Sequence, residues 1–177
     1  NILCRVFDID LPIASHLGNL SSFCINSNHL LNVKIPAMYN MNAVKNFSSM
    51  FWDCMNLLSV TGLSICNKFN FQTSAIFRGC VSLKSTDYAF FHTCYGGWAR
   101  AFYDCKNLEI DIADLLYYPF SSKFEELNVV DLFKNCAKLY GTVPADKLWN
   151  NKEIKWLNTS SAFTGCSDEI RAQVPMS

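Results

Sequence analysis

Charged residues are scarce in this chain of 177 residues, and their signs cancel. Lys and Arg number 15, Asp and Glu number 15, and charged residues make up only 17% of the sequence. A chain without a net field does not attract nucleic acid or an anionic membrane over long distances. We therefore expect no nucleic acid as a partner.

Long apolar runs are absent as well. No run approaches the roughly 20 residues that a membrane-spanning helix requires, so we expect no membrane insertion. The sequence opens with Asn1-Ile2-Leu3-Cys4 instead of Met, a basic segment and an apolar stretch. We expect the chain to be a fragment, a processed product or the ordered part of something longer.

The nine cysteines form no Cys-x-x-Cys pair, and the three histidines lie far apart in the sequence. This spacing does not fit a structural zinc site, so we expect no metal and no cofactor. Buried free thiols are the favoured state of the cysteines, and the odd count leaves room for one disulfide bridge. The cysteine pattern does not determine whether the protein belongs to a reducing or an oxidising compartment.

Catalytic motifs are also missing. The carboxylate pairs Asp8 with Asp10 and Glu109 with Asp111 are spaced two apart, which on a strand places each pair on one face. A glycosidase could use such a pair, although solvated charges are the more common role. We expect a protein that is not an enzyme, with the carbohydrate hydrolase kept as a third hypothesis.

What the chain does contain is a repeat. Five Phe-x-x-Cys motifs recur at intervals of 25 to 31 residues: Phe51-x-x-Cys54, Phe77-x-x-Cys80, Phe102-x-x-Cys105, Phe133-x-x-Cys136 and Phe163-x-x-Cys166. A period of this size is typical of stacked units that cannot bury their apolar faces alone. With 50% hydrophobic residues, the chain is expected to form one domain over residues 1–177, covered at its N-terminal side by something else.

Further columns accompany the Phe and Cys positions. A Leu stands three residues after Cys in most copies, and an amide stands five before Phe at Asn46, Gln72, Asn128 and Asn158, with Gly97 as the exception. We expect the amide to bond the backbone of neighbouring turns. Two N-terminal copies are predicted by allowing substitutions: Ile25-x-x-Asn28-x-x-Leu31, and Cys4-x-x-Phe7 in the Cys and Leu columns.

Alternation of apolar and polar residues follows the Leu column in the better copies and predicts short half-buried strands. These are Phe7–Leu11, Leu31–Ile35, Leu108–Ile112 and Leu139–Val143. The copies after Leu57 and Leu83 keep the alternation poorly. Proline ends several of these segments because it cannot donate to a ladder.

These motifs resemble leucine-rich repeats, in particular the bacterial surface-protein (BspA-like) class and the 25-residue repeats of mycoplasmal surface proteins. The copies most similar to them are Ala101-Phe102-Tyr-Asp-Cys105-Lys-Asn-Leu108, Ser161-Ala162-Phe163-Thr-Gly-Cys166 and Met50-Phe51-Trp-Asp-Cys54-Met-Asn-Leu57. The resemblance implies an α/β fold: a right-handed solenoid of about seven turns, with short parallel strands on one face and irregular or short helical turns opposite. It also implies a role in adhesion or partner recognition.

The outward positions of the expected strands form a candidate binding surface, which we call the strand ribbon. By alternation it comprises Asp8, Asp10, Asn32, Lys34, Lys84, Thr86, Glu109, Asp111, Tyr140, Thr142, Arg171 and Gln173. This mixed, mildly acidic set suits a protein or glycan better than a polyanion. Any of these residues could instead be a simple solvated position.

A second candidate surface, the aromatic flank, lies in the two longer copies. It comprises Tyr117, Tyr118, Trp149 and Trp156. Aromatic side chains are common anchors at interfaces, but local core is the favoured interpretation at these offsets.

The sequence therefore predicts a non-enzymatic, surface-displayed repeat domain for adhesion or for protein or glycan recognition. We expect it on a cell surface, outside the cell or on a virion. The alternative is a structural subunit, such as a decoration or fibre component of a phage virion or another large assembly, whose neighbours bury the aromatic flank.

Overall fold

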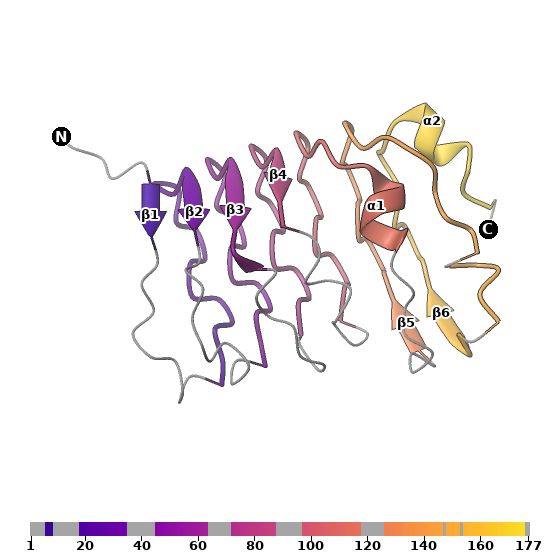
Figure 1. Ribbon diagram of the computed structural model, residues 1–177, viewed down its shortest axis with the longest axis horizontal. Helices are drawn as coiled ribbons and strands as arrows, with labels where there is room; N and C mark the ends of the chain where they lie inside the picture. The colour runs from indigo at the N-terminus through magenta and orange to yellow at the C-terminus, as the bar shows by residue number, and fades with distance from the viewer. Residues whose placement is uncertain are drawn as a thin grey trace.

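The computed structural model describes residues 6–8, 18–34, 45–63, 72–87, 97–117, 126–146, 148–152 and 154–175. In chain order its elements are β1 (Val6–Asp8), β2 (Asn32–Lys34), β3 (Ser59–Thr61), β4 (Ser85–Thr86), α1 (Ile112–Tyr117), β5 (Glu126–Asn128), β6 (Trp156–Asn158) and α2 (Asp168–Arg171). The strands pair in parallel, β1 to β4 in order and β5 with β6 (Figure 1). The predicted combination of short parallel strands with few, short helices is confirmed.

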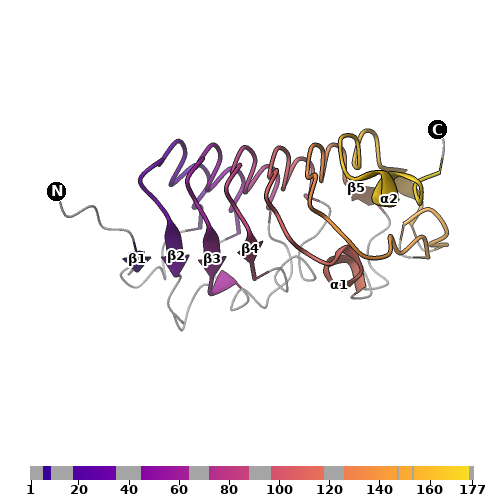
Figure 2. The same ribbon diagram turned by 90° about the horizontal axis from the view of Figure 1, so that it is seen from above.

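Between the strands the chain forms a series of similar turns, which we call arches. They cover residues 19–30, 46–57, 72–83, 97–108, 128–139 and 158–166, and each contains a Phe-x-x-Cys motif or its equivalent. Figure 2 shows the arches following one another along one edge of the molecule, with β1 to β4 on the opposite side. The copies of the repeat therefore lie side by side in sequence order.

Successive arches are joined by backbone hydrogen bonds of one pattern. The N–H groups of the Phe, of the residue two before it and of the residue two after it donate to the next arch. Ser49, Phe51 and Asp53 thus donate to the carbonyl oxygens of Ser74, Ile76 and Arg78, at N to O distances of 2.9, 2.9 and 2.7 Å. These bonds satisfy the backbone of an otherwise irregular segment.

Two positions in every arch have a left-handed backbone, and the sequence analysis missed the signal that marks them. The residue two after the Phe column is Asn, Asp or Gly in every described arch: Asn26, Asp53, Gly79, Asp104, Asn135 and Gly165, with φ between 56° and 76°. These are the residue types that tolerate positive φ best. The position two before the Phe column also has positive φ, and there the residues are Ser22, Ser49, Ala75, Arg100, Asp131 and Ser161.

The phenylalanines stack on one another through the core. Ring centroids from Phe51 to Phe77, Phe102, Phe133 and Phe163 follow at 5.6, 5.5, 5.7 and 5.8 Å. Their side chains are at most 4% exposed, and the Leu and Cys columns are buried beside them. Each offset pair adds about 0.5–1.5 kcal/mol to the stabilisation from buried area. The core is therefore a continuous column along the stack.

Strands β1 to β4 share one register. Phe7 pairs with Val33, Val33 with Val60, and Val60 with Thr86. Val33 and Val60 are buried between neighbours of higher exposure, so the sheet turns one face to the core. The inward residue of these strands stands three positions after the Leu column.

This register corrects both predicted N-terminal copies. Cys24, not Ile25, occupies the Phe column, because its carbonyl oxygen accepts the Cys54 thiol as the Phe51 oxygen accepts that of Cys80. The second copy is therefore Cys24-x-x-Ser27-x-x-Leu30, one residue earlier than predicted. Phe7 lies in the strand column with Val33, not in the Leu column. In the other arches the Phe identifies the register of the repeat, and in this arch a Cys stands in its place.

The strand predictions also need correction. The segments after Leu108 and Leu139, which alternate well, are joined only by an isolated bridge between Asp111 and Tyr140. The poorly alternating segments contain β3 and β4. The reason is register: Ile110 and Ile112 are buried two and four residues after Leu108, so this copy is out of phase with the inward column of β4.

The amide column was predicted to bond neighbouring turns, and this is wrong for the side chains. The side-chain Oδ1 atoms of Asn19, Asn46, Asn128 and Asn158 each accept the N–H two residues later in their own arch. The backbones of this column do pair between arches, through the bridges from Asn19 to Asn46 and Asn46 to Gln72 and through the ends of β5 and β6. Asn here shapes the start of the arch.

Gly79 provides a direct test of the left-handed column. Its φ is +76°, and a Cβ there would lie 1.9 Å from Asp53 Oδ1. We expect Gly79→Ala to lower the free energy of unfolding by about 1–2 kcal/mol or more, because both backbone and space disfavour a side chain. Urea unfolding would measure this.

The matched control is Gly97→Ala. Gly97 lies outside the positive-φ set, and a methyl group added there would have its nearest neighbouring atom at 3.5 Å, an ordinary contact. This variant should unfold at the wild-type urea concentration or slightly above it. Equal midpoints for the two variants would contradict the assignment of the column.

Thr86 offers a second test, because its buried hydroxyl has no hydrogen-bond partner among the described residues. Thr86 stands in the inward column with Val33 and Val60. We expect Thr86→Val to raise the free energy of unfolding by about 1 kcal/mol, and Val60→Thr to lower it by a similar amount or more. Thermal unfolding of the pair measures both signs, and a destabilised Thr86→Val variant would overturn the assignment of Thr86 to the core.

Candidate functional site

The strand ribbon is present in part. Lys34, Lys84, Glu109, Tyr140 and Thr142 are exposed, and Lys84, Glu109 and Tyr140 stand in successive copies of the repeat. Their backbone is joined from copy to copy: Glu109 donates to the Lys84 carbonyl at 3.0 Å, and Tyr140 donates to the Ile110 carbonyl at 3.4 Å. The ribbon thus presents basic, acidic, aromatic and hydroxyl groups from a paired backbone.

Two ribbon residues bond to neighbouring copies through their side chains. Asn32 is half-buried, and its Oδ1 accepts the Ser59 hydroxyl at 2.7 Å. Glu109 forms an ion pair with Lys138 at 3.3 Å, where both side chains are about half exposed. An exposed pair of this kind contributes little stability, so Glu109 is available to a partner.

Thr86 does not belong to the ribbon surface. The prediction placed it outward, but it is 8% exposed and lies in the inward column. The prediction counted alternate residues from the Leu column, whereas β4 turns its third residue after Leu83 toward the core. Thr86 is therefore a core residue.

Asp111 has a local structural role. Its Oδ1 accepts the N–H of Ala113 at 2.8 Å, at the start of α1, and the same oxygen lies where a side chain on Gly141 would have to fit. Acceptors of this type favour helix starts. With Glu109 paired to Lys138, the two carboxylates are engaged separately, and nothing in their contacts prepares them as an acid and base pair.

Arg171 and Gln173 do not continue the ribbon as a strand. Arg171 ends α2, a helix capped by the Ser167 side chain and carrying Asp168 and Glu169 in its first turn. Ser at the cap, acids at the start and a base at the end all favour a helix. Gln173 is half-buried, and its side chain bonds the Val143 N–H at 2.8 Å and the Gly141 carbonyl at 3.2 Å.

Four predicted site residues lie wholly or partly outside the described structure. Asp8 lies in β1 and Tyr117 ends α1, but their side chains lie outside the described part of the structure. Asp10 and Tyr118 lie outside the described residues altogether. For these positions the binding role stays a prediction.

The aromatic flank divides into two kinds of residue. Trp149 is half-buried and packs against the core, with its ring 6.1 Å from that of Phe163 and its Nε1 donating to Thr159 Oγ1 at 3.4 Å. Trp156 is 49% exposed. Local core, the favoured interpretation, is correct for Trp149, whereas Trp156 is available as an anchor.

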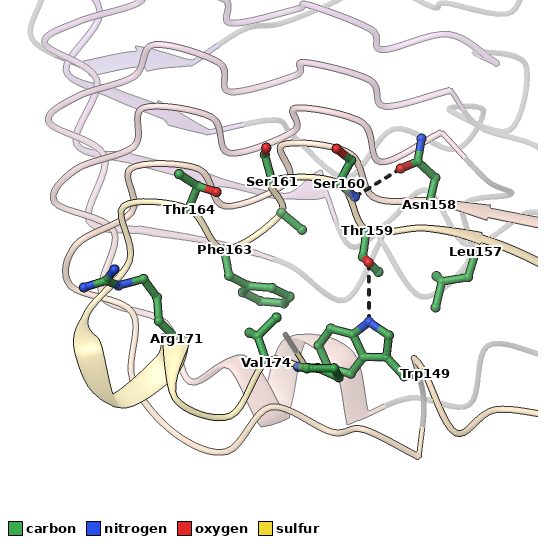
Figure 3. Close-up of a pocket in the computed structure, with 12 residues that line it drawn as sticks. Trp149, Leu157, Asn158, Thr159, Ser160, Ser161, Phe163, Thr164, Arg171 and Val174 are labelled. Carbon is green, nitrogen blue, oxygen red and sulfur yellow. Dashed lines mark hydrogen bonds between the residues drawn. The ribbon is translucent and has the colours of Figure 1, made fainter. Parts of the chain in front are cut away.

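Beside the last arch lies a hollow of about 760 Å³. Figure 3 shows Trp149, Phe163 and Val174 around it, with Thr159 above the indole and Arg171 at one side. The other lining residues come mostly from the last arch: Leu157, Asn158, Ser160, Ser161, Ala162, Thr164 and Pro175. An open hollow with aromatic walls and few charges suits an apolar group rather than an ion.

A stripe of cations and aromatic rings follows the position after the Phe column, and the sequence analysis missed it. The Arg78 guanidinium lies 4.8 Å from the Trp52 ring and 5.1 Å from the Tyr103 ring, and Lys134 lies 5.4 Å from Tyr103. Each side chain belongs to a different arch. Such contacts link the arches on their outer surface by roughly 0.5–1 kcal/mol each.

The cysteine prediction is confirmed for the described cysteines, which are free and buried. Each Cys column thiol donates to a carbonyl of the preceding arch: Cys54 to Cys24, and Cys80, Cys105, Cys136 and Cys166 to the Phe there, at 2.9 to 3.2 Å. The column therefore supplies a small apolar group and a hydrogen-bond donor together. Cys4, Cys66 and Cys94 lie outside the described residues.

Burial makes these thiols unreactive. It raises the pKa of Cys54 and of Cys166 from 9.0 to about 11, and it raises the pKa of Cys105 well above 9.0. A thiol that stays protonated is a poor nucleophile and a poor metal ligand. Within the described part of the chain, no group of three or more His, Cys, Asp or Glu is placed to hold a metal ion.

The raised pKa values predict how stability depends on pH. The folded state holds the thiol proton more tightly than the unfolded state, so stability is complete below pH 9.0 and falls as pH rises toward and beyond about 11. Cys105→Ser keeps a donor and does not titrate. We expect its free energy of unfolding, relative to wild type, to rise between about pH 8 and about pH 10.5, as measured by urea unfolding; a constant difference would contradict the pKa shift.

Comparison with known proteins gives a likeness of fold. No protein-family model matches the chain, and no curated protein matches it. Two solved structures are similar: TpLRR of T. pallidum, with 18% identity, a TM-score of 0.48 and 76% of this chain covered, and a protein from Eubacterium ventriosum, with 21% identity, a TM-score of 0.40 and 78% covered. Both are leucine-rich repeat proteins.

The family of these two structures is the one that the Phe-x-x-Cys motifs resemble. The chain spans 54% of the length of the first and 31% of the second. At these identities the likeness concerns the fold alone. Among the described residues, no helix has the length and apolar character needed to cross a bilayer.

Proposed function

We propose that this chain is a recognition domain that binds a protein or a glycan on its strand ribbon and carries out no chemistry of its own. The observation that supports this is the exposure of Lys84, Glu109 and Tyr140 on successive copies of a hydrogen-bonded backbone, with Lys34 and Thr142 exposed elsewhere on the ribbon. A surface that is ordered before binding loses little free energy on ordering when a partner arrives.

The proposal includes the architecture in full: a right-handed solenoid of about seven turns. What supports it is the uniform ladder between arches and the parallel order of β1 to β4. In such a stack each unit contacts only its neighbours, which makes an extended surface from few residues per unit.

The chemistry of the ribbon favours a protein or glycan over a polyanion. Lys34 and Lys84 are followed by Glu109, whose charge offsets one of theirs, and then by Tyr140 and Thr142. Tyr presents a rigid ring with a polar tip, and hydroxyl groups suit varied hydrogen bonding. Adhesion, with display on a cell surface, outside the cell or on a virion, is the biological setting that the sequence resemblance implies.

A structural subunit of a larger assembly is the second candidate. Large apolar side chains are open to solvent, with Phe23 57%, Met55 49% and Trp156 49% exposed. Exposed apolar groups in a chain with few charges favour contact with neighbours. A decoration or fibre component would bury them.

Ribbon variants test the recognition function. The wild-type domain would be screened against immobilised glycans and extracellular proteins, and each ligand found would be tested with Lys84→Glu and Tyr140→Ala. We expect each change to weaken binding at least about tenfold, the effect typical of an interface anchor. Surface plasmon resonance would measure the dissociation constants.

The matched control is Lys106→Glu, an exposed lysine on an arch and not on the ribbon. It makes the same charge change as Lys84→Glu and should leave binding within about twofold of wild type. Equal loss with both lysine variants would place the site elsewhere or show a non-specific charge effect. No ligand in either screen would contradict the recognition function itself.

A further inference from the structure

The side chains that follow the Phe column form a surface separate from the ribbon. Trp52, Arg78, Tyr103 and Lys134 stand at this position in four successive arches, and each is half-buried. We call these four residues the cation–aromatic stripe. Figure 2 shows the arches along one edge of the molecule, with β1 to β4 on the opposite side. The stripe and the ribbon therefore belong to different sides of the molecule.

Arg78, in the middle of the stripe, is a cation without a counter-ion. The other arginines in the described part of the chain face carboxylates: Arg100 pairs with Asp131 at 3.2 Å, and Arg171 pairs with Asp168. Arg78 forms no ion pair and no side-chain hydrogen bond with any residue that the structure describes. Its half-buried charge is therefore balanced by aromatic rings alone.

Two carboxylates stand in the next column, and both are directed along that column. Asp53 Oδ1 lies against Gly79, where an added Cβ would come within 1.9 Å of it. Asp104 Oδ1 accepts the side-chain N–H of Asn135 at 2.7 Å. Each carboxylate thus contacts its own column in the following arch, and the N–H donors of Arg78 are left to a partner from outside the chain.

The neighbouring rings determine which side of Arg78 a partner can reach. The guanidinium carbon lies 4.8 Å from the centre of the Trp52 ring and 5.1 Å from that of the Tyr103 ring, one arch to each side. A guanidinium stacked on rings keeps the N–H donors at its edge, and their fork matches the two oxygens of a carboxylate. Ring edges carry partial positive charge, whereas ring faces are negative. The outer edge of this stack therefore attracts an anion.

We propose that the cation–aromatic stripe binds an acidic segment of a partner protein, with Arg78 holding the carboxylate of an Asp or Glu side chain. The edges of Trp52 and Tyr103 flank this carboxylate and exclude water from it. Trp, Arg and Tyr are the residue types most enriched among the anchors of protein interfaces, and the fold places one of each side by side. This second site does not depend on a ligand at the ribbon.

The arrangement of the rings favours a protein over a glycan or a nucleic acid. Nucleobases stack on the faces of aromatic side chains, and sugar rings do the same. Cations from the arches on either side, Arg78 and Lys134, lie 5.1 and 5.4 Å from the centre of the Tyr103 ring, so its faces are occupied. A partner meets the edge of the stack, where a carboxylate on a flexible side chain fits.

Fluorescence anisotropy with three defined probes tests the proposal on the full chain. The probes are a labelled octapeptide of alternating Gly and Glu, its counterpart with Gln in place of Glu, and a labelled tetragalacturonate, which carries the same number of carboxylates on a sugar backbone. The wild type should bind the Glu peptide at least about tenfold more tightly than either of the other probes, because hydrogen bonds to a charged group are stronger than neutral ones.

Variants at two arginines assign the binding to Arg78. Arg78→Gln should weaken binding of the Glu peptide at least about tenfold, and Arg78→Lys, which keeps the charge but loses the fork, should lie between it and the wild type. Arg100→Gln is the matched control, since it makes the same charge change one arch away at an arginine that is already paired. Asp131 keeps its contact with Lys134 at 3.3 Å, and binding should stay within about twofold of wild type.

Two further measurements separate this site from the ribbon and from effects on folding. Lys84→Gln, on the ribbon, should bind the Glu peptide as the wild type does. In nitrogen-15 NMR spectra of the wild type, the Arg78 Nε–H signal should shift when the Glu peptide is added, a result that requires no variant to fold. An unmoved Arg78 signal, equal loss in Arg78→Gln and Arg100→Gln, loss in Lys84→Gln, equal binding of the Gln peptide or tighter binding of tetragalacturonate would each overturn the proposal.

Discussion

The backbone ladder between arches runs in one direction along the stack: its N–H groups point toward the next arch, and the carbonyl oxygens that accept them point toward the previous one. The residues two before and two after the Phe column have positive φ, and the chain turns there. Between the ladder donors, the intervening N–H groups bond carbonyl oxygens three residues earlier in the same arch, as Trp52 bonds Ser49 and Cys54 bonds Phe51. Without these two sets of bonds the buried backbone of the arch would lack partners at a cost of about 1–3 kcal/mol for each group.

The side-chain columns follow from that backbone. Because each arch repeats the path of its neighbour, identical residues meet, and phenylalanine rings stack at 5.5 to 5.8 Å. The thiol of each Cys donates to the carbonyl oxygen of the Phe in the preceding arch, which the backbone ladder between arches does not use. A valine there would fill the space but donate nothing, and a serine would donate but is less apolar. Cysteine satisfies both demands, which explains a column of free thiols that form no disulfide among the described cysteines.

Much of this repeat could be predicted from sequence because the columns are regular where packing is tight. The Phe, Cys and Leu positions and the free thiols came from spacing and residue type, and the parallel strands came from the resemblance to leucine-rich repeats. The register of the first arch could not be predicted, because Cys24 occupies the position at which Phe identifies the register in the other arches. Ile25, one residue later, is also apolar and was assigned to the Phe column instead. The ribbon prediction was wrong at Thr86 and Arg171 for a related reason, because alternation is a local pattern. The face that Thr86 occupies is set by the pairing of β4 with β3, and the position of Arg171 is set by the helix that Ser167 caps. The column two after the Phe is harder to recognise, because Asn, Asp and Gly share a backbone preference rather than a shape.

The polarity of the ladder also determines what a partner can contact along the sides of the stack. There the backbone groups of the arches are engaged in the ladder, so a partner at the ribbon meets side chains such as Lys84 and Tyr140 and is selected by their chemistry. Binding at the ribbon therefore depends on which side chains the copies expose, and a substitution at one of them leaves the backbone ladder of the arches intact.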